Sequence, residues 1–231
     1  MLADIGTAEM MRLRYPDEEV KDFGMAALTP GFIDLHARVE DGVLRGLIRD
    51  LPFVEWRKNI GDLRSRISSK EAYDSAYLGC LEELSAGVTT IGDTTSTGAA
   101  VFAAQDCGLR AVVYREAGAI DKRLVNYAMK KVDSDLEKWS QSVDEDRIVL
   151  GIAPDPVYEC HPELYRSAAK YAAEHNNLPI AMKLAGSNEE LRFVKDGATA
   201  GLDSTVDHRG FVEVPLYWSY ILWRNVGAWR S

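Results

Sequence analysis

A short segment near the start of the chain, GFIDLHAR over residues 31–38, brings together three groups of different chemistry: Asp34, His36 and Arg38. Residues 32–35 are mostly apolar and follow a proline and a glycine, so the segment predicts a buried strand that carries polar side chains to its end. An acid and a histidine can hold a metal ion or move a proton, whereas arginine is a permanent cation that repels a metal ion. We therefore expect one ligand-type side chain, His36, beside a fixed positive charge.

The elements that must position these groups alternate between strand and helix along the chain. Glycines at 87, 108 and 197 mark stops, and the crossover segments between the apolar runs have helical spacing. No hairpin turn joins consecutive runs, which predicts parallel strands with right-handed crossovers. The expected strands cover residues 32–36, 88–92, 111–115, 148–153 and 179–184, and the expected helices cover 69–87, 99–107, 121–141, 161–175 and 188–195.

Five strand-helix units predict an α/β fold of the TIM type that is incomplete, because a closed barrel has eight such units. We assign residues 31–197 to this partial (β/α) barrel. Residues 1–30 contain short alternating and apolar stretches, which indicate a β remnant of a sandwich lobe, and residues 39–70 indicate a long loop with short helical turns. Chemistry in such a fold belongs at the carboxyl ends of the strands.

Residues 198–231 form a third region, in which Trp218, Trp223 and Trp229 lie close together with tyrosines and leucines. One interpretation is a terminal helix that covers the chain's own core. The other is an interface, because aromatic residues concentrate in interface cores and an open barrel leaves two strand edges to be covered. We expect a homo-oligomer, or a partner chain, held through this segment.

The composition limits the class of partner. The 231 residues carry a formal net charge of -9, with 46% hydrophobic and 27% charged residues. An acidic protein is a poor partner for nucleic acid or for an anionic membrane, so a small molecule or another protein is expected. No long apolar segment or secretory leader is visible, which predicts a cytoplasmic protein. Cys80, Cys107 and Cys160 lack metal-site or disulfide spacing, and we expect reduced thiols.

Four segments together resemble one family. With Thr29 and Pro30, the first segment is similar to the PGFxDxHxH signature of the metal-dependent amidohydrolase superfamily. The other segments are GVTTIGDTTSTG at 87–98, GLRAVVYREAG at 108–118 and the stretch 151–191. In this order they resemble the cytosine deaminase and triazine chlorohydrolase branch, most closely the aminodeoxyfutalosine deaminase-like proteins. The resemblance implies a hydrolase that uses a divalent metal ion.

The chain departs from that family at most of the functional positions. His36 stands at the first ligand position, but Arg38 occupies the second and Lys183 occupies the ligand position of the fifth strand. Asp155 replaces a substrate-contacting histidine, and Gly186 replaces the proton-transferring glutamate. Catalytic zinc sites usually have three protein ligands, so we expect no metal cofactor, with zinc or iron as the alternative.

Positive side chains in place of a metal ion suggest a cluster of ion pairs. Arg38 and Lys183 would neutralise the acids Glu116 and Asp155, together with Asp34. Arg38, Glu116, Asp155 and Lys183 are therefore the candidate pocket residues, and Glu116 and Asp155 are the candidate substrate-binding residues.

Three hypotheses about function follow. The first is a catalytically degenerate amidohydrolase-like chain that acts as a binding or assembly subunit. The alternative is a hydrolase or deaminase that acts on C–N bonds of a purine- or triazine-like molecule, with its site completed by another chain. The third is a metal-free enzyme in which Lys183 is a nucleophile or Schiff-base amine and Arg38 lowers its pKa. Whether the chain is an enzyme depends on which of these holds.

Overall fold

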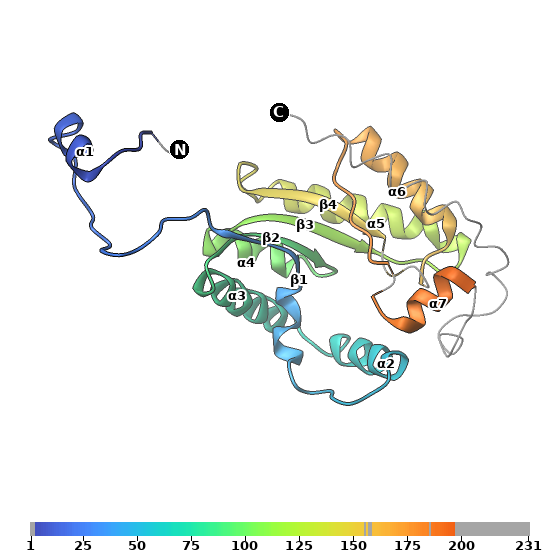
Figure 1. The fold of residues 1–231 in the computed structure, drawn as a ribbon. Helices are drawn as coiled ribbons and strands as arrows, with labels where there is room; N and C mark the ends of the chain where they lie inside the picture. The colour runs from blue at the N-terminus through green and yellow to red at the C-terminus, as the bar shows by residue number, and fades with distance from the viewer. Residues whose placement is uncertain (1–2, 155, 157–158, 185, 197–231) are drawn as a thin grey trace. The chain divides into compact units, whose positions relative to one another are not determined.

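The computed structural model describes residues 3–154, 156, 159–184 and 186–196. The chain divides into two units, Met1–Pro30 and Gly31–Ser231. Figure 1 shows the order of the elements along the chain. No helix of the described residues is long and apolar enough to cross a bilayer.

The second unit contains a parallel sheet of four strands in the order β1-β2-β3-β4. The strands are β1 (Phe32–Ala37), β2 (Val88–Thr95), β3 (Arg110–Ala117) and β4 (Ile148–Pro154). Four of the five predicted strands are therefore confirmed, together with their parallel direction and sequential order. This is the arrangement of one part of a TIM-type barrel.

The fifth predicted strand, 179–184, is wrong in extent. The main chain pairs with β4 only around Ile180: the N–H of Ile152 donates to the carbonyl of Pro179 at 3.0 Å, and the N–H of Ala181 donates to the carbonyl of Ile152 at 3.1 Å. Lys183 is exposed and carries the only charge in the run. This exposed charged side chain interrupts the apolar run, which favours the short pairing.

Helices follow the strands nearly as the sequence predicts. α3 (Ser69–Ser85) begins with a capping box between Ser68 and Glu71, one residue before the expected cap. α4 (Ala99–Cys107) ends at Gly108, whose φ of 75° lies in the left-handed region that glycine adopts without strain. Three more helices of the described residues follow the strands: α5 (Lys122–Ser140), α6 (Pro162–Glu174) and α7 (Asn188–Asp196).

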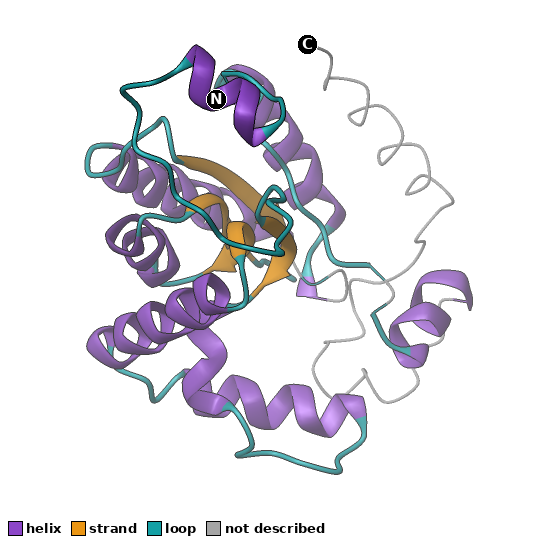
Figure 2. Cartoon of the chain, turned by 60° about the vertical axis from the view of Figure 1, so that its left-hand side comes forward, coloured by secondary structure: helices purple, strands orange, loops and turns teal. Residues whose placement is uncertain are grey.

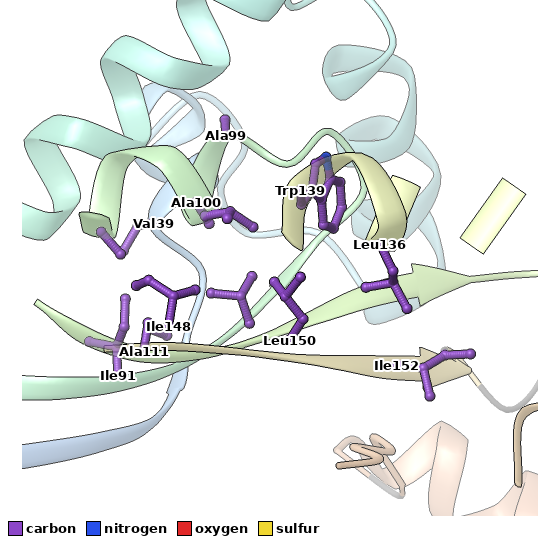
Figure 3. Packing of buried hydrophobic residues seen from close by; sticks show 14 of the residues in the cluster. Val39, Ile91, Ala99, Ala100, Ala111, Leu136, Trp139, Ile148, Leu150 and Ile152 are labelled. Atoms are coloured by element: carbon purple, nitrogen blue, oxygen red, sulfur yellow. The ribbon is translucent and has the colours of Figure 1, made fainter. Parts of the chain in front are cut away.

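The core lies between the sheet and the helices α3 to α6, which cover one face of the sheet (Figure 2). Ile91, Val113 and Ile152 are fully buried on that face. Figure 3 shows Trp139 of α5 against this layer. Gly98 must be a glycine at this point, because its φ is 88° and a Cβ there would lie 2.6 Å from the Trp139 ring.

The prediction that β1 is a buried strand is wrong. Phe32, Ile33 and Leu35 are 66%, 61% and 82% exposed. β1 is an edge strand of the described sheet and pairs only with β2, and Ala37 is the one buried residue of this strand. An apolar run indicated burial but could not indicate which strand lies at the edge.

Two other expectations are corrected. Between Ala3 and Pro30 the described residues form α1 (Ala8–Arg14) and no strand. Thr7 caps this helix, and its residues favour helix more strongly than their short alternation favours strand. In the predicted loop after β1, the chain forms a 3₁₀ helix, η1 (Val39–Leu44), and a full helix, α2 (Phe53–Arg64).

Candidate functional site

The carboxyl ends of β1, β2 and β3 lie side by side and carry the charged residues of the candidate site. Ala37 pairs with Asp93, and Thr95 pairs with Arg115, so Arg38 and Glu116 follow at the same edge of the sheet. Parallel pairing forces this alignment, because all carboxyl ends point the same way. The sequence places these groups far apart, and the register brings them together.

Arg38 is the centre of the ion pairs. Its Nη2 lies 2.6 Å from Oε1 of Glu116, and its Nε lies 3.2 Å from Oδ2 of Asp41. Arg64 of α2 binds the same Asp41 carboxylate. The pKa of Arg38 is raised: burial lowers it, but the carboxylates of Glu116 and Asp41 outweigh burial. The guanidinium is therefore a fixed cation held between β1, β3 and η1.

Glu40 ties η1 to the start of α4. Its Oε1 accepts hydrogen bonds from the Thr97 hydroxyl at 3.0 Å and from the Ala100 N–H at 3.1 Å, and also from the Thr95 hydroxyl. Burial raises the pKa of this carboxyl, although the hydrogen bonds from Thr95, Ala100 and Thr97 oppose the shift. The side chain fixes the turn after β2 and positions the main chain beside Arg38.

Asp93 lies at the end of β2 and is completely buried. Its Oδ2 accepts a hydrogen bond from the Val39 N–H at 2.9 Å, whereas Oδ1 has no hydrogen-bond partner among the described residues. Burial raises the pKa of this carboxyl well above its ordinary value. The raised pKa favours the protonated form more than in an exposed aspartate, and the hydrogen bond from Val39 holds the chain where β1 ends.

The predicted site residues are only partly brought together. The ion pair of Arg38 with Glu116 is present. Asp34 Oδ1 instead accepts a hydrogen bond from the His36 main-chain N–H at 2.8 Å, and the His36 side chain is exposed. Lys183 is exposed and forms no ion pair with a carboxylate of the described part of the chain. Asp155 lies outside the described residues, so its expected pairing stays a prediction.

Two other histidines have structural positions. His161 caps α6, because its Nδ1 accepts a hydrogen bond from the Glu163 N–H at 3.1 Å. His175 stacks on Tyr171 with the ring centroids 3.9 Å apart. His208 lies outside the described residues.

The described residues do not fit a resident metal ion. Among them, no group of three histidine, cysteine, aspartate or glutamate side chains is placed to hold one. Two acids beside Arg38, Asp41 and Glu116, are paired to guanidinium groups. A divalent ion beside Arg38 would meet a fixed positive charge, so the arrangement supports binding through hydrogen bonds and charge.

Two cavities touch Arg38. The larger, of about 380 Å³, is lined by Trp56, Ile60, Glu82 and Glu83 among others, and so follows the last turns of α3. It is also lined by Asp41 and other residues of η1, so it extends from Arg38, at the site edge, along η1 to those turns of α3. The smaller, of about 60 Å³, is at the edge itself and is lined by Glu40, Asp41, Arg64 and Thr97. Small-molecule sites usually enclose roughly 300 to 1,000 Å³.

Reasoning from the sequence missed Glu40, Asp41, Asp93 and Arg64. A signal was present for Asp93, since it directly follows the β-branched run VTTIG and ends a predicted strand. Glu40 and Asp41 were assigned to a loop, and Arg64 belongs to a helix that the irregular pattern did not predict.

Comparisons with known proteins agree on one family. A sequence model described as "Amidohydrolase family" matches residues 27–215. The 5-methylthioadenosine/S-adenosylhomocysteine deaminase of Carboxydothermus hydrogenoformans is 29% identical over 72% of this chain and 39% of its own length. The 5'-deoxyadenosine deaminase of Methanocaldococcus jannaschii is 26% identical over 81% of this chain and 45% of its own length. The chain thus spans less than half the length of these relatives.

Solved structures show the same fold. Helicobacter pylori aminofutalosine deaminase, in complex with methylthio-coformycin, superposes with a TM-score of 0.73 at 19% identity, over 92% of this chain and 50% of that chain. Atrazine chlorohydrolase TrzN from Arthrobacter aurescens, complexed with zinc, gives a TM-score of 0.58 at 19% identity, over 70% and 43% of the two chains. These likenesses confirm the partial barrel.

Proposed function

This chain belongs to the amidohydrolase family, and we propose that it takes part in the hydrolysis of a C–N bond in a purine-like small molecule, with its site completed by another chain. The substrate class comes from the relatives, which are deaminases of adenosine derivatives. The predicted resemblance to this branch is confirmed by the same comparisons.

The observation that carries the proposal is the open, charged edge at the carboxyl ends of β1 to β3. The cavity beside the end of β2 measures only about 60 Å³, which is too small for a purine, and the larger cavity at Arg38 runs away from it along η1 and α3. Glu116 and Arg38 nevertheless remain about one-fifth exposed, at 20% and 21% of their side chains. A paired carboxylate and a guanidinium that reach solvent at an unfinished pocket are groups that a completing chain would enclose.

Glu116 has a defined part in this proposal. Its carboxylate is fixed by Arg38 and is an acceptor, so it can receive hydrogen bonds from the amine or hydroxyl groups of a purine derivative. Asp155 is the second substrate-binding residue of the proposal and lies outside the described residues. Arg38 acts through Glu116, since it holds that carboxylate in place.

A metal ion, zinc or iron, would supply the activated water that hydrolysis of this kind needs. The described residues contribute no complete set of ligands, and in this proposal the completing chain provides ligands beyond His36. In this proposal, this chain binds the substrate and orients it through Glu116 and Asp155.

A second candidate function is favoured by one observation. The Arg38–Glu116 ion pair places a permanent cation in the position where the family has its second metal ligand. A chain of this kind can bind a small molecule, or assemble with an active partner, without catalysis of its own. This is the binding or assembly subunit that the sequence suggested.

The partner contact is part of the same proposal. We assign it to the aromatic segment around Trp218, Trp223 and Trp229, which lies outside the described residues and could join two copies or a different chain. Light scattering on the wild type and on Trp223→Asp tests this. A monomer in both cases, with an unchanged melting temperature, contradicts the assignment.

Ammonia release tests the hydrolase. The tagged chain is expressed in its own cells, isolated with its partners under native conditions, and given 5'-methylthioadenosine in the presence of zinc. We expect ammonia from the wild type, none from His36→Ala, and unchanged release from the matched control His175→Ala. Activity that survives His36→Ala contradicts the proposed joint site.

The same preparation separates the two candidates. If no ammonia forms but calorimetry detects binding of 5'-methylthioadenosine that is weakened by Glu116→Gln, the binding subunit is supported. If neither hydrolysis nor binding is found, both candidates are rejected for this substrate class.

A further inference from the structure

Two thiols that the proposed function does not use meet between α3 and α4. The residues buried along these two helices are small: Ala76 and Cys80 on α3, and Ala103 and Ala104 on α4, are fully buried. Small side chains let two helices approach closely. Cys107, the last residue of α4, lies at the same contact.

The position of Cys107 is fixed by a contact with α3. Its Sγ lies 3.8 Å from the carbonyl oxygen of Tyr77, one helical turn before Cys80. Side chains of a helix lean toward its amino end, so the Cys80 thiol points back to the level of Tyr77. The Cys107 thiol is among the groups that raise the pKa of Cys80, in agreement with two side chains that lie near each other.

The two cysteines differ in their access to solvent. Cys80 is completely buried, whereas Cys107 is half-buried at a helix end that Gly108 terminates. Cys160 lies elsewhere, buried against the carbonyl oxygen of Ala117 at 3.5 Å. A small oxidant can therefore reach Cys107 first, and Cys80 is the thiol placed to react next.

We propose that Cys80 and Cys107 are a redox modification site, at which a peroxide joins α3 to α4 through a disulfide. Cys107 would reduce hydrogen peroxide to water and become a sulfenic acid. The Cys80 sulfur would then attack the Cys107 sulfur, the S–O bond would break, and a second water would leave. Overall, the two thiols lose two electrons and two protons, and one peroxide becomes two waters.

The cross-link would act on the edge of the candidate site. Ser75 of α3 donates a hydrogen bond to the Glu40 carbonyl at 3.0 Å, and the Ala100 N–H of α4 donates to the Glu40 carboxylate at 3.1 Å. Both helices therefore hold the same residue of η1. A bond between them would restrict the movement of Glu40 relative to β2, whether or not the proposed hydrolysis is correct.

The pKa values of the two thiols determine the rate of this oxidation. Burial raises the pKa of Cys80 to about 12, and burial also raises the pKa of Cys107. The thiolate is the reactive form, so we expect slow oxidation at neutral pH. Below the pKa of Cys107, the oxidation rate should rise about tenfold per pH unit.

Mass spectrometry of tryptic peptides tests the site. No lysine or arginine lies between Glu71 and Arg110, so one peptide carries both cysteines and Cys160 lies outside it. After treatment of the folded chain with hydrogen peroxide, we expect this peptide to be about 2 Da lighter, and dithiothreitol to restore its mass. The matched variants are Cys107→Ser, which should abolish the change, and Cys160→Ser, which should retain it.

Several outcomes would overturn the proposal. They are a loss of 2 Da that requires urea denaturation, roughly equal oxidation of Cys160, and higher oxides at Cys107 without a disulfide. A melting scan gives a second measurement that does not depend on the variants. Oxidised wild type should melt at a higher temperature than its reduced form, and an unchanged melting temperature would show that α3 and α4 are not joined.

Discussion

The guanidinium of Arg38 lies 2.6 Å from the carboxylate of Glu116, which joins the end of β1 to the end of β3 across the intervening strand β2. This contact spans 78 residues of sequence. It places a fixed positive charge at the edge where the family has a metal ion, so it determines what the site of this chain can do.

Removal of Arg38 should destabilise the fold. Arg38→Ala leaves Glu116 and Asp41 as part-buried acids with weaker pairing, and we expect the free energy of unfolding to fall by about 1 to 3 kcal/mol. Urea denaturation measures this change. The matched control is Arg45→Ala, because Arg45 pairs with Glu82 in solvent and should contribute little. An equal effect of both variants would contradict the structural role of Arg38.

Asp93 should make stability depend on pH. Its pKa is raised in the folded chain, so the folded state binds a proton more tightly than the unfolded state. Stability is therefore expected to fall as the pH rises above the unfolded value of 3.8 toward the folded value. Asp93→Asn keeps an acceptor for the Val39 N–H and removes the charge.

The advantage of Asp93→Asn over the wild type should accordingly be absent near pH 3 and grow toward neutral pH. Urea denaturation at several pH values tests this. Asp74→Asn, at an exposed position on α3, should show no such trend. A wild-type stability that rises through the same window, with no gain in the variant, would show that the carboxyl is ionised at low cost.

Gly98 should be intolerant of a side chain. Gly98→Ala places a Cβ 2.6 Å from the Trp139 ring at a residue with φ of 88°. We expect a loss of roughly 2 kcal/mol or more of stability from strain and overpacking. Thermal unfolding checks this against Gly61→Ala in α2, where nothing lies within 4 Å. That control should be neutral or stabilising by about 0.5 to 1 kcal/mol.

Glu40 should anchor α4 to η1. Glu40→Ala removes the acceptor of three hydrogen bonds, including that of the Ala100 N–H. We expect the free energy of unfolding to fall by about 2 to 4 kcal/mol, because alanine offers no acceptor to the three donors. Hydrogen exchange of the Ala100 amide should become faster. If this amide stays as protected as the α4 interior, the anchor is not needed.

The sequence predicted the repeated features and missed the features that depend on tertiary context. Periodicity and glycine stops located the strands from β1 to β4 and the helix ends at Gly87 and Gly108, because these signals are local. The exposure of Leu35 could not be predicted, since apolar character does not reveal an edge strand. The same holds for Ile180, where pairing ends after one residue.

The candidate site was predicted in part for the same reason. Resemblance to the family identified Arg38 as a substitute for a metal ion and Glu116 as an acid that it neutralises. It gave no information about Glu40 and Asp93, whose roles arise from burial and from hydrogen bonds to η1 and α4. Such roles depend on the register of β1 against β2, which the sequence alone does not specify.

The metal content of this chain, purified alone after exposure to zinc or iron and then dialysed, tests the central claim most directly. The account predicts well below one equivalent per chain, with no difference between the wild type and His36→Ala, because Arg38 occupies the position of a ligand and the described residues supply no group of three. About one equivalent of metal per wild-type chain, lost on His36→Ala, would contradict it and show that the chain holds the ion without a partner.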